Sequence, residues 1–130
     1  MAWFYEQNTG KQYDPEGILE GTGYSGGQAG NAPYAINNHY LQNVRGVGPI
    51  PCGIYRFGTP TDGTHLGPFA IPLIPDEDNN MFGRSAFYIH GDNFSLNHSA
   101  SDGCIVHMRS LREKMWNSSN HVLLVYFNDL

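Results

Sequence analysis

The residues best suited to covalent chemistry are a histidine and a cysteine, each placed beside a short apolar segment. His90 ends the run Phe87-Tyr88-Ile89, and Cys104 follows Gly103 and precedes Ile105-Val106. A free thiol is mostly protonated at neutral pH, so a nucleophilic cysteine needs a base. An imidazole within hydrogen-bond reach takes the thiol proton and later gives it to the leaving amine. This pair therefore predicts acyl transfer, with Cys104 as nucleophile and His90 as its base.

Two strands have to position the pair. The segment Ser85–Ile89 predicts a strand that ends at His90, and Gly103–Val106 predicts a second short strand or a turn. Strand ends at the mouths of loops are places where a rigid scaffold presents reactive groups. Gly103 allows close approach of the backbone, so the amides of Gly103 and Cys104 are candidates to bind the developing oxyanion.

The rest of the chain predicts a mainly β domain with one main helix. Its 130 residues fit a single domain, residues 1–130, and its 16 glycines and 8 prolines indicate many turns and short elements. The helix is expected over Met108–Asn117, with Met108, Leu111 and Met115 on one face. Further predicted elements are a hairpin over residues 3–13, a third strand over 18–24, a helical turn within 33–38, a strand over 54–57 and a buried closing strand over 122–127. Because prolines interrupt residues 66–74, that segment is expected to be an edge or irregular strand.

Charge and hydropathy exclude two classes of partner. The net charge is −5, and the seven Lys and Arg residues do not cluster before Arg109–Lys114, which argues against a nucleic-acid partner. No apolar run approaches the roughly 18 residues that cross a bilayer, so no membrane span is expected. The first residues carry neither a basic start nor an apolar core, so we expect synthesis in the cytoplasm without a signal peptide.

Neither a metal nor a cofactor is expected. The acidic run 76–80 lacks the spacing of a calcium loop, and a solvated loop is the better interpretation. His98 and His107 flank Cys104, but no zinc-site spacing accompanies them. Cys52 is interpreted as a small core or near-surface thiol; a disulfide with Cys104 is the alternative.

Beyond these local patterns, the chain resembles the L,D-transpeptidase (YkuD-like) superfamily, whose signature is His-Gly followed downstream by Ser/Thr-His-Gly-Cys. It is most similar to the Tlde1-like branch of small type VI secretion effectors. Motifs in matching order cover nearly the whole chain; they are the aromatic hairpin near the start, Gly23–Gly26, Gln42–Val44, Val47–Tyr55, Met81–Ser85, the two segments around His90 and Cys104, and Arg112–Lys114. The resemblance implies an L,D-transpeptidase-like β-sandwich or barrel.

The resemblance also implies the roles of individual residues. His90 matches the catalytic histidine and Cys104 the cysteine that carries the acyl group, while Ser101 and Gly103 match the Ser/Thr and Gly of the signature. Asp102 stands where the superfamily usually has a second histidine, so the role of that histidine does not transfer. Asp102 either orients a neighbouring imidazole or, as we favour, shapes the turn.

Substrate binding is assigned by hypothesis to Arg84, Arg109 and Gly91, since an arginine binds a carboxylate through two hydrogen bonds. The resemblance implies cleavage of the bond to D-Ala in the tetrapeptide stems of peptidoglycan through a thioester. Water then gives L,D-carboxypeptidase activity, and an amine gives exchange or cross-linking. It further implies an immunity protein, a secretion-apparatus partner and action in the periplasm of a target bacterium.

Two other functions compete with this one. The first is a catalytically inactive cell-wall binding module on the same fold, for which the departure at Asp102 is the best argument. The second is a thiol-redox or metal-binding protein.

Overall fold

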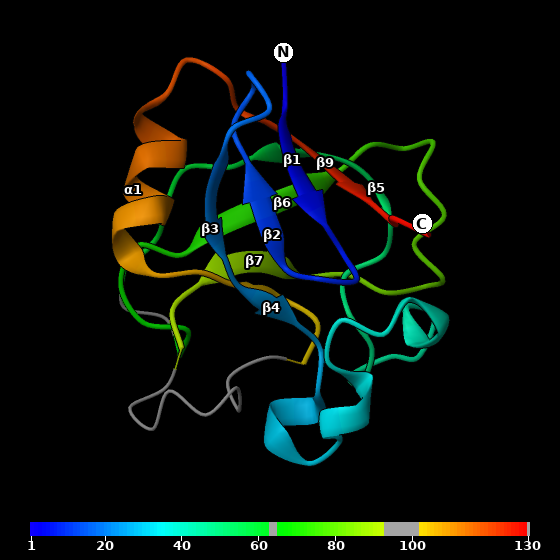
Figure 1. Ribbon diagram of the computed structural model, residues 1–130. Helices are drawn as coiled ribbons and strands as arrows, with labels where there is room; N and C mark the ends of the chain where they lie inside the picture. The colour runs from blue at the N-terminus through cyan, green and yellow to red at the C-terminus, as the bar shows by residue number, and fades with distance from the viewer. Residues whose placement is uncertain (63–64, 93–101, 130) are drawn as a thin grey trace.

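A computed structural model describes residues 1–62, 65–92 and 102–129. Within them the chain forms a nine-stranded, barrel-like sheet that is nearly closed, with one α-helix beside it (Figure 1). The mainly β fold with one main helix is therefore confirmed. The strands are β1 (Trp3–Glu6), β2 (Lys11–Tyr13), β3 (Leu19–Thr22), β4 (Tyr24–Ser25), β5 (Gly53–Phe57), β6 (Ile71–Pro75), β7 (Phe87–His90), β8 (Ile105–Val106) and β9 (Val122–Tyr126).

The sheet order β3-β2-β1-β9-β5-β6-β7-β8-β4 explains why the barrel almost closes. Strands β3 and β4 lie at opposite ends of this order but are separated in the chain only by Gly23. The third strand predicted over residues 18–24 is thus divided at this glycine. A Cβ on Gly23 would lie 2.0 Å from Val106 O and 2.3 Å from His107 Nδ1, so the chain crosses between the two sheet edges only without a side chain.

The sequence predicts an edge or irregular strand over residues 66–74, and the edge position is wrong, because β6 lies between β5 and β7. Its two neighbours pair with different parts of it. Strand β7 pairs with residues 71–73 and β5 with residues 73–75. Each proline therefore has a strand partner on one side, and the missing N–H groups do not interrupt a continuous ladder.

The predicted helix is confirmed as α1 (Arg109–Asn117), with one correction on its buried face. Leu111 and Met115 are buried, but Met108 is 71% exposed because it precedes the first helical turn. Arg112 is buried in its place. Inward-facing side chains of the sheet and helix form the core; the largest are Trp3, Tyr5, Tyr55, Ile50, Ile71, Ile89, Ile105, Met115 and Leu123.

Three 3-10 turns fill the long connection between β4 and β5, at Gln28–Gly30, Pro33–Ala35 and His39–Leu41, and lie together near β4 (Figure 1). The second is the predicted helical turn. No helix among the described residues is long and apolar enough to cross a membrane.

Candidate active site

Strands β7 and β8 run parallel and bring the predicted pair to the same side of the sheet. Ile89 pairs with Ile105 and His90 with Val106. Cys104 directly precedes β8, and extension of this register by one step sets it opposite Tyr88, on the same face as His90. Both line one cavity of about 740 Å3. The structure therefore places the predicted base and nucleophile in a common cleft.

The imidazole of His90 is buried and held in one orientation. Its Nδ1 lies 2.8 Å from the main-chain oxygen of Gly91, and since a carbonyl only accepts, Nδ1 carries the proton. Nε2 then has the lone pair, as a general base requires. Burial, with a smaller contribution from the nearby Arg112 guanidinium, lowers the pKa of His90, so the ring is neutral at pH 7.

The thiol of Cys104 is also uncharged at rest. Burial, with a contribution from Asp102, raises its pKa to about 11. The sulfur lies 3.9 Å from the main-chain oxygen of Ala86, a weak contact on the β7 side of the cleft. The Tyr88 amide and the Arg84 guanidinium act in the opposite direction and favour the thiolate. The resting site therefore has a protonated thiol and a neutral imidazole in one cleft, rather than a thiolate–imidazolium ion pair.

The residues just before Cys104 form a turn with one exposed and one buried member. Asp102 is exposed and lines the cleft, while Gly103 is buried. Gly103 adopts a φ of +142°, and a Cβ there would lie 2.5 Å from Arg84 Nη2 and 3.0 Å from the Phe87 ring. The glycine is therefore required by close packing of a side chain behind it. Ser101, the other predicted member of the signature, lies outside the described residues.

Arg84 lies behind this turn. It is 5% exposed, and its guanidinium stacks 5.1 Å from the centre of the Phe87 ring. Its Nη groups donate to four main-chain oxygens, those of Gln42, Gly48, Pro49 and Asp102. It also lines a smaller pocket of about 220 Å3 that shares Ala86, Asp102 and Cys104 with the cleft. Its substrate-binding role stays a prediction, and a carboxylate would have to compete with these carbonyls.

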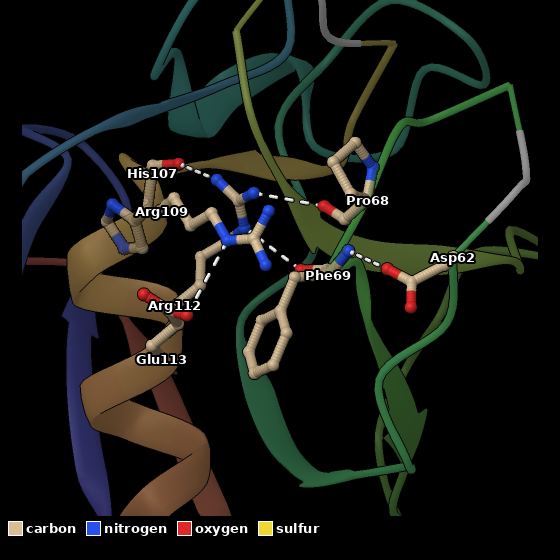
Figure 2. Close-up of polar contacts among 7 residues, drawn as sticks. All are labelled: Asp62, Pro68, Phe69, His107, Arg109, Arg112 and Glu113. Carbon is tan, nitrogen blue, oxygen red and sulfur yellow. Dashed lines mark hydrogen bonds and ion pairs between the residues drawn. The ribbon is translucent and has the colours of Figure 1, made fainter.

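Arg109 and Gly91, the other residues assigned to substrate, border a second hollow of about 690 Å3. It shares Leu66, Gly67, Gly91 and Asp92 with the cleft of Cys104. Arg109 is exposed and pairs with Glu113 at 3.6 Å on the helix surface (Figure 2). The two hollows therefore adjoin, and both substrate-binding roles stay predictions.

Arg112 is a residue of this region that the local sequence pattern did not mark. Its guanidinium donates to the main-chain oxygens of His107 (2.6 Å), Phe69 (3.0 Å) and Pro68 (3.1 Å), as Figure 2 shows. Asp62 holds the Phe69 amide at 2.8 Å in the same cluster. Arg112 thereby joins α1 to the chain that leaves β8 and to the loop before β6.

Ser25 and Tyr24, on β4, were also missed as site residues. Ser25 Oγ donates to Gly103 O at 2.8 Å, and Tyr24 Oη donates to Asp92 Oδ1 at 2.7 Å. Each contact joins residues far apart in the sequence. The sequence signal for Tyr24 and Ser25 is the motif Gly23–Gly26, which is part of the family resemblance.

Both cysteines are free thiols. Cys52 is half-buried, its sulfur lies 3.9 Å from His39 Nδ1, and burial raises its pKa to about 11. Within the described ranges, no three His, Cys, Asp or Glu side chains are close enough to hold a metal ion. His107 instead bonds Gln12 in the core at 2.9 Å, and His98 lies outside the described residues.

Comparison with known proteins identifies the family. The model of the Tlde1 domain matches residues 21–125, which include β4 to β8, α1, parts of β3 and β9, and the residues that line the cleft. No curated protein matches the chain. No solved structure matches it either. Since the matched region covers most of the chain, this protein belongs to the Tlde1 domain family of type VI secretion effectors.

Proposed function

We propose that the protein is a cysteine acyl-transfer enzyme that acts on the tetrapeptide stems of peptidoglycan. Cys104 is the nucleophile and His90 the base. The observation that carries the proposal is the common cleft: two neighbouring strands bring the two side chains to one cavity, and Gly91 fixes the imidazole with Nε2 as its proton acceptor.

The reaction begins when the thiol proton of Cys104 passes to Nε2 of His90. The sulfur attacks the carbonyl carbon of the peptide bond that precedes the terminal D-Ala, and the electron pair moves to the oxygen. As the tetrahedral intermediate collapses, the C–N bond breaks and the imidazolium protonates the amine of D-Ala. A thioester on Cys104 and free D-Ala are the products of this half-reaction.

The second half-reaction consumes the thioester. With water, His90 takes a proton from the attacking molecule, the C–S bond breaks, and the imidazolium returns a proton to the Cys104 sulfur. The tripeptide is released with a free carboxyl group; this is L,D-carboxypeptidase activity. With an amine, the same step forms a new amide bond and gives exchange of a D-amino acid or a cross-link between stems. The hollow beside the cleft is where an acceptor has room to approach.

A digest of purified tetrapeptide muropeptides tests this function, with D-Ala release followed by mass spectrometry. Cys104→Ala is expected to abolish release, and His90→Gln to reduce it by about 10²- to 10⁴-fold, the usual contribution of a general base. Matched controls lie outside the cleft: Cys52→Ala, and His121→Gln at the Trp116 carbonyl. Undiminished release by Cys104→Ala would contradict the proposal.

We further infer that the protein acts in the periplasm of a target bacterium and that the producing cell makes an immunity protein against it. Membership of an effector family supports both statements. Expression with a periplasmic signal peptide is expected to arrest growth, whereas cytoplasmic expression and periplasmic Cys104→Ala leave growth unchanged. Equal toxicity of Cys104→Ala would favour the alternative of a binding module without catalysis.

A further inference from the structure

We propose that Arg84 and Ser25 are positioning residues that turn the amides of Gly103 and Cys104 toward the reacting carbonyl. The inference rests on the proposed acyl transfer and adds to it which side chains orient the oxyanion-binding amides. Neither residue is assigned to touch the substrate in this role. Each acts on a main-chain carbonyl of the turn that carries the nucleophile.

Ser25 fixes the carbonyl of Gly103. The Ser25 side chain is fully buried, and its Oγ donates to Gly103 O at 2.8 Å. The same Oγ accepts the amide of Ile50, also at 2.8 Å, so its own proton is directed to Gly103. Pairing of Ser25 with Ile105 across β4 and β8 holds the serine beside the turn. A buried hydroxyl with both roles filled has one orientation.

Arg84 contacts the preceding carbonyl, that of Asp102, through the longest of its hydrogen bonds. Its Nη2 donates to Asp102 O at 3.4 Å and to Gly48 O at 2.9 Å, while Nη1 donates to Pro49 O at 2.7 Å. Among the described residues, the ion pairs do not include Arg84, so carbonyls rather than a carboxylate solvate its charge. The fork of the guanidinium therefore joins the turn to the segment 48–49.

Arg84 and Ser25 are both hydrogen-bonded to one short segment, Gly48-Pro49-Ile50. Arg84 binds the oxygens of Gly48 and Pro49, and Ser25 binds the amide of Ile50. The carbonyls of Asp102 and Gly103 consequently point to the same side of the turn. This gives a physical role to residues 48–50 of the motif Val47–Tyr55.

Peptide geometry then orients the amides. In a trans peptide the N–H points opposite to the C=O of the same plane, and the described peptide bonds include no cis bond. Carbonyls 102 and 103 point toward Gly48–Ile50, so amides 103 and 104 point away from it. Cys104 lines the cleft, and we infer that its own amide and that of Gly103 face the same side. Consecutive N–H groups beside a nucleophile are the donors that stabilise a tetrahedral oxyanion.

Two reactions of Cys104 test the inference, since only one develops an oxyanion. Acylation by p-nitrophenyl acetate passes through a tetrahedral intermediate; alkylation by iodoacetamide does not. Rates for both are measured by intact mass, with peptide mapping to separate Cys104 from Cys52. Ser25→Ala is expected to slow acylation at least about tenfold, below the 10²- to 10³-fold loss of a direct donor, while alkylation changes less than about twofold. Ser118→Ala, whose serine bonds Trp3 Nε1 and Met115 O, is the matched control and keeps both rates.

Each outcome is decisive. Acylation of Ser25→Ala at the wild-type rate, or an equal fall in both rates, overturns the inference, because the serine then has no role or only supports the fold. If Ser25→Ala is unfolded by circular dichroism, Arg84→Lys is measured instead with the same expectation, because lysine keeps the charge but lacks the fork. Wild-type protein that is alkylated but never acylated at Cys104 would contradict the proposed function itself.

Discussion

At the scale of single residues, the pair at the centre of the proposed reaction is uncharged at rest. Burial raises the pKa of the Cys104 thiol and lowers that of the His90 imidazole, so proton transfer between them is unfavourable in the empty cleft. Substrate and the oriented amides have to make that transfer favourable. The site thus resembles a serine hydrolase, in which the proton moves as the nucleophile attacks, more than a preformed thiolate–imidazolium pair.

The pH dependence of alkylation follows from this state. We expect the rate of Cys104 alkylation by iodoacetamide to rise with pH through pH 8.5 and to level off only above pH 11, because the thiolate is the reactive form. Peptide mapping by mass spectrometry separates Cys104 from Cys52, which has a pKa raised to a similar value. A plateau already reached at pH 7 would show a thiolate at rest and contradict this description.

Gly103 provides a second prediction at this scale. In Gly103→Ala the new Cβ meets Arg84 Nη2, so the turn shifts and acylation of Cys104 is lost. Gly17→Ala is the matched control, because Gly17 also has a positive φ (+84°) but has nothing within 4 Å of the added Cβ. We expect the control to lose about 1 kcal/mol of stability and to keep acylation. Equal acylation by both variants would contradict the packing role of Gly103.

At the scale of elements, Arg112 joins three segments through main-chain oxygens. We expect Arg112→Met to lower the free energy of unfolding by about 2–4 kcal/mol, because buried carbonyls lose their donors. Arg109→Met removes a cation from the same helix but breaks only an exposed pair with Glu113, so its effect should stay within about 1 kcal/mol. Urea denaturation measures both. Similar losses for the two variants would contradict the role of Arg112.

The elements also show what the sequence can predict. The spacing of Leu111 and Met115 predicts the helix. His90 ends one short apolar segment and Cys104 directly precedes another, so the candidate pair is recognisable in the sequence. Tertiary contacts cannot be recognised from the sequence in this way. Ser25 reaches Gly103 across 78 positions, and no local pattern marks such a hydrogen bond. The prolines of β6 suggested an edge or irregular strand. In the structure β7 and β5 pair with different halves of β6, and the sequence of one strand does not show such an offset between its two neighbours.

At the scale of the whole molecule, closure of the sheet buries a histidine that must stay neutral. His107 bonds Gln12 Oε1, and its Nδ1 is buried without a hydrogen-bond partner in the described structure. Burial, with a contribution from Arg112, lowers the pKa of His107 to about 3. The second hollow and the crossing point at Gly23 both border His107, so acid is expected to open the fold there first.

The loss of stability in acid follows from the lowered pKa of His107. The unfolded chain binds a proton on His107 below about pH 6.5, whereas the folded chain does not until about pH 3, so protons favour unfolding. We expect the free energy of unfolding to fall between pH 6.5 and pH 3, by up to about 1.4 kcal/mol per pH unit from this residue. The lowered pKa of His90 also reduces the free energy of unfolding as the pH falls. His107→Gln should show a shallower fall in urea titrations; an unchanged slope would contradict the assignment.

The central claim is that Cys104 carries the acyl group, and trapping of the acyl-enzyme tests it most directly. A carbapenem acylates a reactive cysteine of this kind and remains attached, so intact mass spectrometry should show one adduct. The adduct is expected on the peptide that contains Cys104, retained in Cys52→Ala and absent in Cys104→Ala. An adduct on Cys52, or D-Ala release that persists in Cys104→Ala without any adduct, would contradict it.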